Sequence, residues 1–172
     1  MMKIRIKFRK YGTMKFIGHL DVMRYFQKAI RRSEVNIRYS EGFSPHQIMS
    51  FAAPLGVGIT SKGEYVDIEV LDTENSKKMI DRLNAVMSEG FEILEYKLLP
   101  DDAANAMSIV AAADYSLVFR PGYEPEKESP EEWFEKLVRF FDADHVMIMK
   151  KTKKGEREMD LKPFVYELNV RK

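Results

Sequence analysis

The first hundred residues alternate between two spacings of apolar side chains. In residues 3–10, Ile4, Ile6 and Phe8 fall on one side, and lysines and arginines fall on the other. A period of two with one apolar face predicts a half-buried strand. In residues 16–32 the apolar face recurs every three or four residues, at His19, Val22, Met23, Phe26 and Ile30. That spacing predicts an amphipathic helix.

More extended segments and one more helix follow in this half. The patterns predict extended structure at 35–39, 48–53, 64–70 and 91–98, and a helix at 76–87. The order β-α-β-β-α-β predicts an α+β fold, a ferredoxin-like sandwich over residues 1–100 with both helices on one sheet face. In that topology the first and third strands are adjacent and central. The basic side of residues 3–10 then lies beside Asp67 and Glu69, and cross-strand ion pairs are expected there.

Residues 101–172 predict a second, incomplete ferredoxin-like unit. After a connecting helix or loop over 101–113, the predicted elements are strand 115–120, helix 130–141, strand 145–150, a charged hairpin at 151–158 and strand 164–170. Ser129 is the predicted N-cap of the helix. The predicted buried side of the helix is Trp133, Phe134, Leu137, Val138 and Phe141. This order, β-α-β-β, lacks the last helix and strand, so either the unit is degenerate or the chain stops before the fold is complete.

The net charge of +1 hides a strong asymmetry along the chain. Residues 1–50 hold eleven lysines and arginines against three acids, a net +8, so the remainder carries −7. A basic block beside an acidic remainder indicates either a polyanionic partner or two halves that neutralise each other. The sequence leaves both explanations open.

Several classes of function are excluded or disfavoured by what the sequence lacks. The chain has no cysteine, so it forms no disulfide, thiolate zinc site or iron–sulfur cluster of its own. No apolar run approaches the roughly 18 residues of a membrane span, and MMKIRIKFRK is not a signal peptide, so a cytoplasmic protein without membrane contact is expected. GxSxG, P-loop and GxGxxG motifs are absent. The sequence therefore leans away from an enzyme and predicts no cofactor in this chain.

The candidate catalytic residues are His19, His46 and Asp21. His19 lies on the apolar side of the first helix and His46 lies in a loop, so each also has a purely structural explanation. If the two imidazoles converge, they offer an acid–base pair. Asp21 projects away from His19 on a helix and is a poor partner for it. No metal site is predicted, because the chain has three histidines without HExxH or a two-histidine, one-carboxylate spacing.

The candidate binding residues are basic and aromatic. They are Arg24, Lys28, Arg31, Arg32 and Arg38, which could hold phosphates, with Tyr39 and Phe43 stacking on bases or shaping a pocket. The alternative is an ordinary solvated face that the acidic half partly neutralises.

Three motifs carry a resemblance to a known family. FIGHLDVMR at 16–24, YSEGFSPH at 39–46 and SKGEYVD at 61–67 are similar to the pattern of the radical SAM-linked protein family, a bacterial domain. The similarity is dense over residues 10–67 and elsewhere covers only the general layout. It departs from the family pattern at Gly18, Ser44 and Gln47.

The resemblance implies a context and a set of site residues. Such domains occur beside or fused to B12-binding radical SAM proteins, and sometimes fused to ribonuclease E/G-like enzymes. The family pattern includes both histidines, Asp21, Arg24, Ser40, Glu64 and Asp67. We therefore expect an accessory domain that binds RNA (tRNA or rRNA), or presents it for modification by a radical SAM partner carrying SAM, an Fe–S cluster and B12. The alternatives are a metal-free RNA-processing enzyme using His19 and His46, and a protein-binding adaptor without RNA contact.

Overall fold

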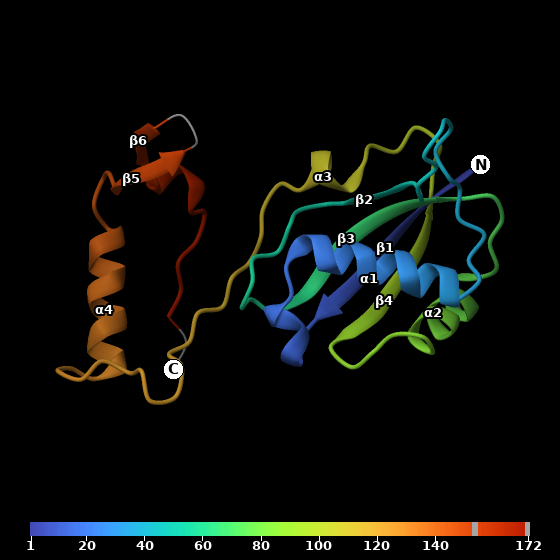
Figure 1. Cartoon of the computed structure of the whole chain (residues 1–172). Helices are drawn as coiled ribbons and strands as arrows, with labels where there is room; N and C mark the ends of the chain where they lie inside the picture. Colours follow the sequence, from blue (N-terminus) through green and yellow to red (C-terminus); the bar gives the residue numbers. More distant parts are fainter. Residues whose placement is uncertain (153–154, 171–172) are drawn as a thin grey trace. The chain divides into compact units, whose positions relative to one another are not determined.

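The computed structural model describes residues 1–152 and 155–170, and the chain divides into two units, Met1–Ala113 and Asp114–Lys172 (Figure 1). The sequence predicts a boundary after residue 100. Residues 101–109 belong with the first unit because they pack on its sheet: the backbone N–H of Ala106 donates to Asp67 Oδ2 at 2.7 Å. The short helix α3 (Ala106–Ile109) lies in this segment.

The first unit is built on a four-stranded sheet. Its strands are β1 (Met2–Lys10), β2 (Met49–Phe51), β3 (Ser61–Val70) and β4 (Phe91–Leu99). They lie in the order β2-β3-β1-β4, and every neighbouring pair is antiparallel. The predicted α+β class is confirmed, and so is the central, adjacent position of the first and third strands.

Two helices, α1 (His19–Arg32) and α2 (Ser76–Asn84), pack on one side of this sheet. The core is a single cluster in which Ile4, Ile6 and Phe8 of β1 meet side chains of both helices, among them Phe26 and Met79. Burial of these apolar side chains is the main force that fixes the helices on the sheet.

The ends of several elements differ from the predictions. The predicted helix 16–32 begins only at His19, because Gly18 is extended as its N-cap and Gly12–Phe16 forms a separate 3-10 turn, η1. The predicted strand 35–39 is wrong: only isolated bridges form there, and the sheet instead takes its edge strand from Met49–Phe51. The predicted helix 76–87 ends at Asn84.

The second unit contains α4 (Pro130–Phe141), the antiparallel pair β5 (Met147–Thr152) and β6 (Gly155–Asp160), and the short turn η2 (Lys162–Phe164). The predicted N-cap is confirmed, because Ser129 and Glu132 form a reciprocal capping box. The predicted hairpin also forms, although residues 153–154 of it lie outside the described residues.

Other predictions for the second unit are wrong. Residues 115–120 and 164–170 form no strand ladder in the described parts of the chain. No residue on the predicted apolar side of α4 is buried. In the segment 115–120, Leu117 and Val118 are 78% and 87% exposed. An alternating pattern becomes a strand only when a neighbouring edge supplies hydrogen bonds, and the only sheet in the described part of this unit is the two-stranded β5–β6 pair.

Across the described residues of both units, no helix combines the length and apolar character needed to cross a bilayer.

Candidate nucleic-acid interface

The cations of β1 all have acceptors within the first unit. Arg5 binds Asp67 through two hydrogen bonds of 2.8 and 2.9 Å, and Lys7 pairs with Glu95 at 3.0 Å. Arg9 pairs with Glu92. The strand register places these carboxylates on β3 and β4, beside β1. The predicted pair with Asp67 is confirmed, whereas Glu69 pairs with Arg38 and not with β1. The other two carboxylates come from β4, and together these pairs engage the basic side of β1 without any ligand.

The remaining two lysines of β1 are held by backbone carbonyls. Lys3 Nζ donates to the carbonyl of Asp101 at 2.7 Å, and Lys10 Nζ donates to that of Ile17 at 3.0 Å. Lys10 is only 1% exposed, and burial lowers the pKa of its ammonium group. Its side chain therefore ties the end of β1 to the segment that leads into α1.

The outward face of α1 differs from β1 in how its cations are engaged. Arg24, Lys28 and Arg31 follow one another at spacings of four and three, so they form one ridge opposite the buried side of the helix. All three are exposed. Among the residues that the structure describes, no carboxylate lies in ion-pair distance of Lys28 or Arg31. These two cations form the unpaired part of the ridge.

The other residues predicted to bind phosphates each have a hydrogen-bond or ion-pair partner. Arg24 meets Asp21 at 3.5 Å, but both side chains are mostly exposed, so the pair is weak. Arg32 donates to the carbonyl of Val86 at 2.9 Å. Arg38 donates to Glu69 at 2.8 Å and lies 3.9 Å from Glu41. Arg38 is thus engaged in the same way as the cations of β1.

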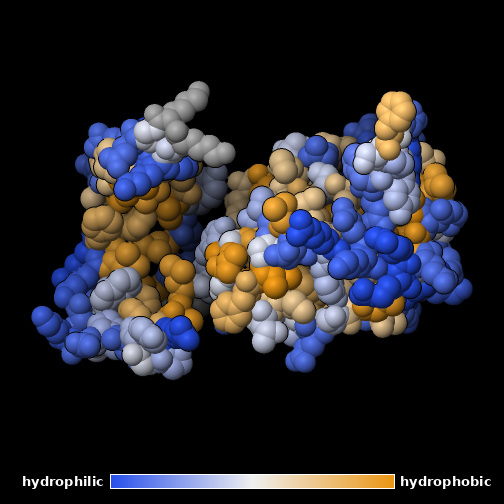
Figure 2. Space-filling model, in the orientation of Figure 1, coloured by the Kyte–Doolittle hydropathy of each residue, from blue (hydrophilic) through white to orange (hydrophobic). Residues whose placement is uncertain are grey.

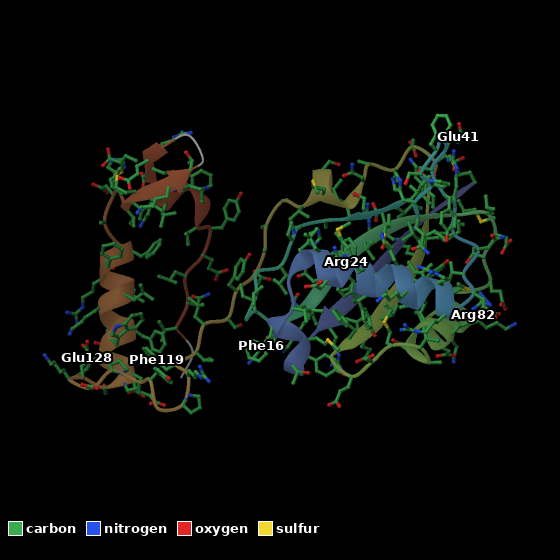
Figure 3. All side chains as sticks on the ribbon, in the orientation of Figure 1. Phe16, Arg24, Glu41, Arg82, Phe119 and Glu128 are labelled. Atoms are coloured by element: carbon green, nitrogen blue, oxygen red, sulfur yellow. The ribbon has the colours of Figure 1, made fainter. Side chains whose placement is uncertain are left out.

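The surface view separates two kinds of surface along α1. Figure 2 shows hydrophilic residues in blue over its middle and later turns, where Figure 3 labels Arg24, and hydrophobic residues in orange around its start. The exposed apolar residues in that part of the chain are Phe16, Leu20, Val57 and Ile59. The segment of Val57 is fixed beside the helix start, because the Gly58 N–H donates to the Lys15 carbonyl at 2.7 Å.

The loop 40–47 holds three of the predicted site residues, Ser40, Phe43 and His46, and Tyr39 directly precedes it. Its neck is closed by hydrogen bonds between Ser40 and His46: Ser40 N donates to the His46 carbonyl, and Ser40 Oγ meets His46 Nδ1, each at 2.8 Å. Directly after this neck, Gln47 Nε2 donates to the Gln27 carbonyl of α1 at 3.3 Å. The loop is therefore closed upon itself and fixed to the helix.

The two candidate imidazoles are not brought together. His19 is the first residue of α1 and packs edge-to-face on Phe51, with 5.4 Å between ring centres. His46 is exposed in the loop that also carries Glu41. Phe16 and Glu41, which are close in sequence to the two histidines, lie on opposite sides of the first unit in Figure 3. This separation offers no acid–base pair, and Asp21 meets only Arg24, in the weak pair described above.

The two candidate acids of β3 are also separated. Glu64 pairs in register with Phe8 and so lies on the helix-covered face, whereas Asp67 pairs with Arg5 on the opposite face. Asp67 accepts from both Arg5 and the Ala106 N–H. It therefore acts as a tie between the sheet and the segment that follows β4, rather than as a free ligand group.

The role of Gln47 could not be predicted from the sequence. This residue is 5% exposed, and its Oε1 has no hydrogen-bond partner among the described residues. It anchors the loop to α1, yet nothing in the pattern of residues 40–47 marks it for burial. The described residues contain no group of three or more His, Asp or Glu arranged to hold a metal ion.

A family model described as "Uncharacterized protein conserved in bacteria (DUF2344)" matches residues 3–172, nearly the whole chain. The chain therefore belongs to this family. No curated protein matches the sequence.

Proposed function

We propose that this member of the DUF2344 family is an RNA-binding accessory domain, and that the ridge on α1 is the surface that contacts the RNA backbone. The observation that carries the proposal is the lack of carboxylate partners for Lys28 and Arg31 among the described residues, in a unit where the cations of β1 are engaged. Phosphates attract such free cations, and the release of counterions from the RNA provides the free energy.

The packing of α1 supports the same proposal. Its buried side is held by the core, so the ridge is presented on a rigid element and loses little conformational freedom on binding. The ridge extends over two helical turns, a length that suits contacts to successive phosphates of one strand.

The wider context of the protein is also part of the proposal. The motifs of residues 10–67 support a radical SAM enzyme as partner, and that enzyme would bring the SAM, Fe–S and B12 chemistry into a shared cytoplasmic complex. We further propose that the first unit is a ferredoxin-like sandwich, which its strand order and its two helices on one face support. A catalytic role for His19 and His46 is not proposed, because they lie apart.

Fluorescence anisotropy of a labelled single-stranded RNA, with the whole chain at about 50 mM salt, tests the proposal. The double variant Lys28→Ala/Arg31→Ala should bind about tenfold more weakly than the natural protein. The matched control is Lys77→Ala/Lys78→Ala on α2, which removes the same charge, but from lysines paired with Asp81 and Glu74. That control should change the affinity less than about twofold.

Two results would contradict the proposal. One is the absence of RNA binding at low salt, which would favour a protein-binding adaptor. The other is an equal loss of affinity in the α1 and α2 variants, which would mean that overall charge, and not the ridge, attracts the RNA.

A further inference from the structure

Phe43 is the most exposed large apolar side chain of the chain's described residues. It is fully exposed, whereas the next highest values, for Val118 and Tyr166, belong to the second unit. Keeping a phenyl ring entirely in water forgoes the stabilisation that its burial would give. The ring therefore contributes nothing to the core of the first unit.

The loop holds this ring away from the core. The Ser40–His46 hydrogen bonds close its neck, so Phe43 sits near the middle of a short closed loop and not on a free end. Gly42, next to the ring, has a φ of +108°, a backbone conformation that other residues rarely adopt. The backbone conformation of the loop therefore sets the direction in which the ring projects.

The loop also lies beside the ridge of α1. The contact between Gln47 and Gln27 is adjacent in sequence to Lys28 and one helical turn from Arg31. Phe43 lies four positions before Gln47, so its Cα lies within about 14 Å of the anchored end of the loop. A single strand of a few nucleotides can therefore touch both the ridge and the ring.

Resting on the proposed function, we infer that Phe43 stacks on an unpaired base and that the RNA element recognised is single-stranded. Stacking needs a free base face, which a duplex buries between its neighbours. The ridge supplies attraction to phosphates in either form of RNA, whereas the ring adds free energy only for an unpaired base. The loop then distinguishes single-stranded from duplex RNA, and the helix supplies affinity for both forms.

The test compares two probes with the whole chain at one salt concentration: a single strand of about 12 nucleotides carrying one 2-aminopurine, and the same strand in a perfect duplex. The single strand should bind at least about fivefold more tightly, with quenching of the 2-aminopurine fluorescence. Phe43→Ala should weaken single-strand binding about tenfold and abolish the quenching, with little effect on the duplex. Phe43→Trp should keep both the affinity and the quenching.

Phe16→Ala is the matched control, because it removes another exposed phenyl ring on the opposite side of the first unit, far from the loop. It should leave both probes unchanged. If Phe43→Ala changes neither probe while Lys28→Ala/Arg31→Ala still weakens binding, stacking is contradicted and the proposed function stands. If neither probe binds at low salt, both proposals fail.

Discussion

Strand β1 carries five cations and helix α1 carries four, but the two sets differ in how many have acceptors within the first unit. In β1 the cations Arg5, Lys7 and Arg9 face carboxylates across the sheet. In α1 one carboxylate, Asp21, stands against four cations, and it meets only the first of them. The difference teaches that a count of basic residues does not identify a binding surface, because the strand register decides which charges remain free.

The largest expected effect comes from giving α1 the carboxylates that it lacks. The double variant Arg24→Glu/Gln27→Glu places an acid four residues before each of Lys28 and Arg31, the favourable spacing for helix ion pairs. The affinity for single-stranded RNA should fall about a hundredfold at low salt, although both cations are still present. Anisotropy titration measures this fall, and circular dichroism should show an unchanged helix content. An unchanged affinity for RNA would mean that carboxylate partners for Lys28 and Arg31 do not affect RNA binding.

The complementary experiment breaks a pair on the sheet. Arg5→Met leaves Asp67 half-buried without its guanidinium partner, which should lower the free energy of unfolding by about 2 kcal/mol. The RNA affinity should stay within about twofold, because this cation is already engaged. Urea unfolding and anisotropy, measured on the same samples, test both statements.

Lys97→Met is the matched control for that experiment. Lys97 lies opposite Arg5 on β4, but it has no ion pair with a carboxylate in the described residues. Its removal should change the stability by less than about 0.5 kcal/mol. Equal destabilisation by the two variants would argue that the Arg5–Asp67 pair contributes nothing specific.

Asp160 in the second unit is another engaged charge, and its contribution to stability can be tested through its pKa. Hydrogen bonds from His145 and from the N–H groups of Val146 and Lys162 lower the pKa of Asp160 to about 2. Because the folded pKa lies below the usual 3.8, this group stabilises the fold above about pH 4, and its contribution is lost as the pH falls towards about 2. Asp160→Asn should therefore weaken the unit at neutral pH.

Trp133 is the only tryptophan of the chain and lies in the second unit, so its fluorescence reports on this unit. An acid titration should show a less stable Asp160→Asn variant at pH 7 and no difference between variant and natural protein near pH 2. A difference that persists at pH 2 would show that the carboxylate charge is not the cause.

The smallest expected effect concerns the acid beside the stacking loop. The Glu41 side chain is 95% exposed and lies 3.9 Å from Arg38, which already pairs with Glu69. Glu41→Gln removes a charge that repels phosphates, so the RNA affinity should rise about twofold at low salt and not at high salt. An unchanged affinity at low salt would place the RNA away from this loop.

The core of the first unit could be predicted from sequence because burial imposes a period on it. Ile4, Ile6 and Phe8 alternate, and Val22 and Phe26 repeat at helical spacing, so the pattern predicts both the strand and the helix. The edge strand Met49–Phe51 lies within the predicted extended segment 48–53. The pattern does not reveal that this segment, and not residues 35–39, forms the edge, because pairing with β3 decides it. In the second unit, the apolar pattern around Leu117 and Val118 also predicts a strand, yet it finds no partner strand in the described part of the chain.

The candidate site was only partly predictable for a related reason. The ridge follows from the sequence because helical spacing fixes which side chains share a face. The engagement of Arg38 by Glu69, and the anchoring of the loop by Gln47, depend on contacts between distant segments. The separation of His19 from His46 likewise follows from the path of the chain across the sheet, which a resemblance in motifs does not reveal.

The salt dependence of RNA binding tests the central claim most directly. For single strands, the slope of log K against log salt changes by about 0.7 for each phosphate that the protein no longer neutralises. Lys28→Ala/Arg31→Ala should flatten the slope by about 1.4, and Lys77→Ala/Lys78→Ala, with the same change in net charge, should leave it unchanged. Equal slopes for the two double variants would contradict the claim that unpaired cations on α1 form the binding surface.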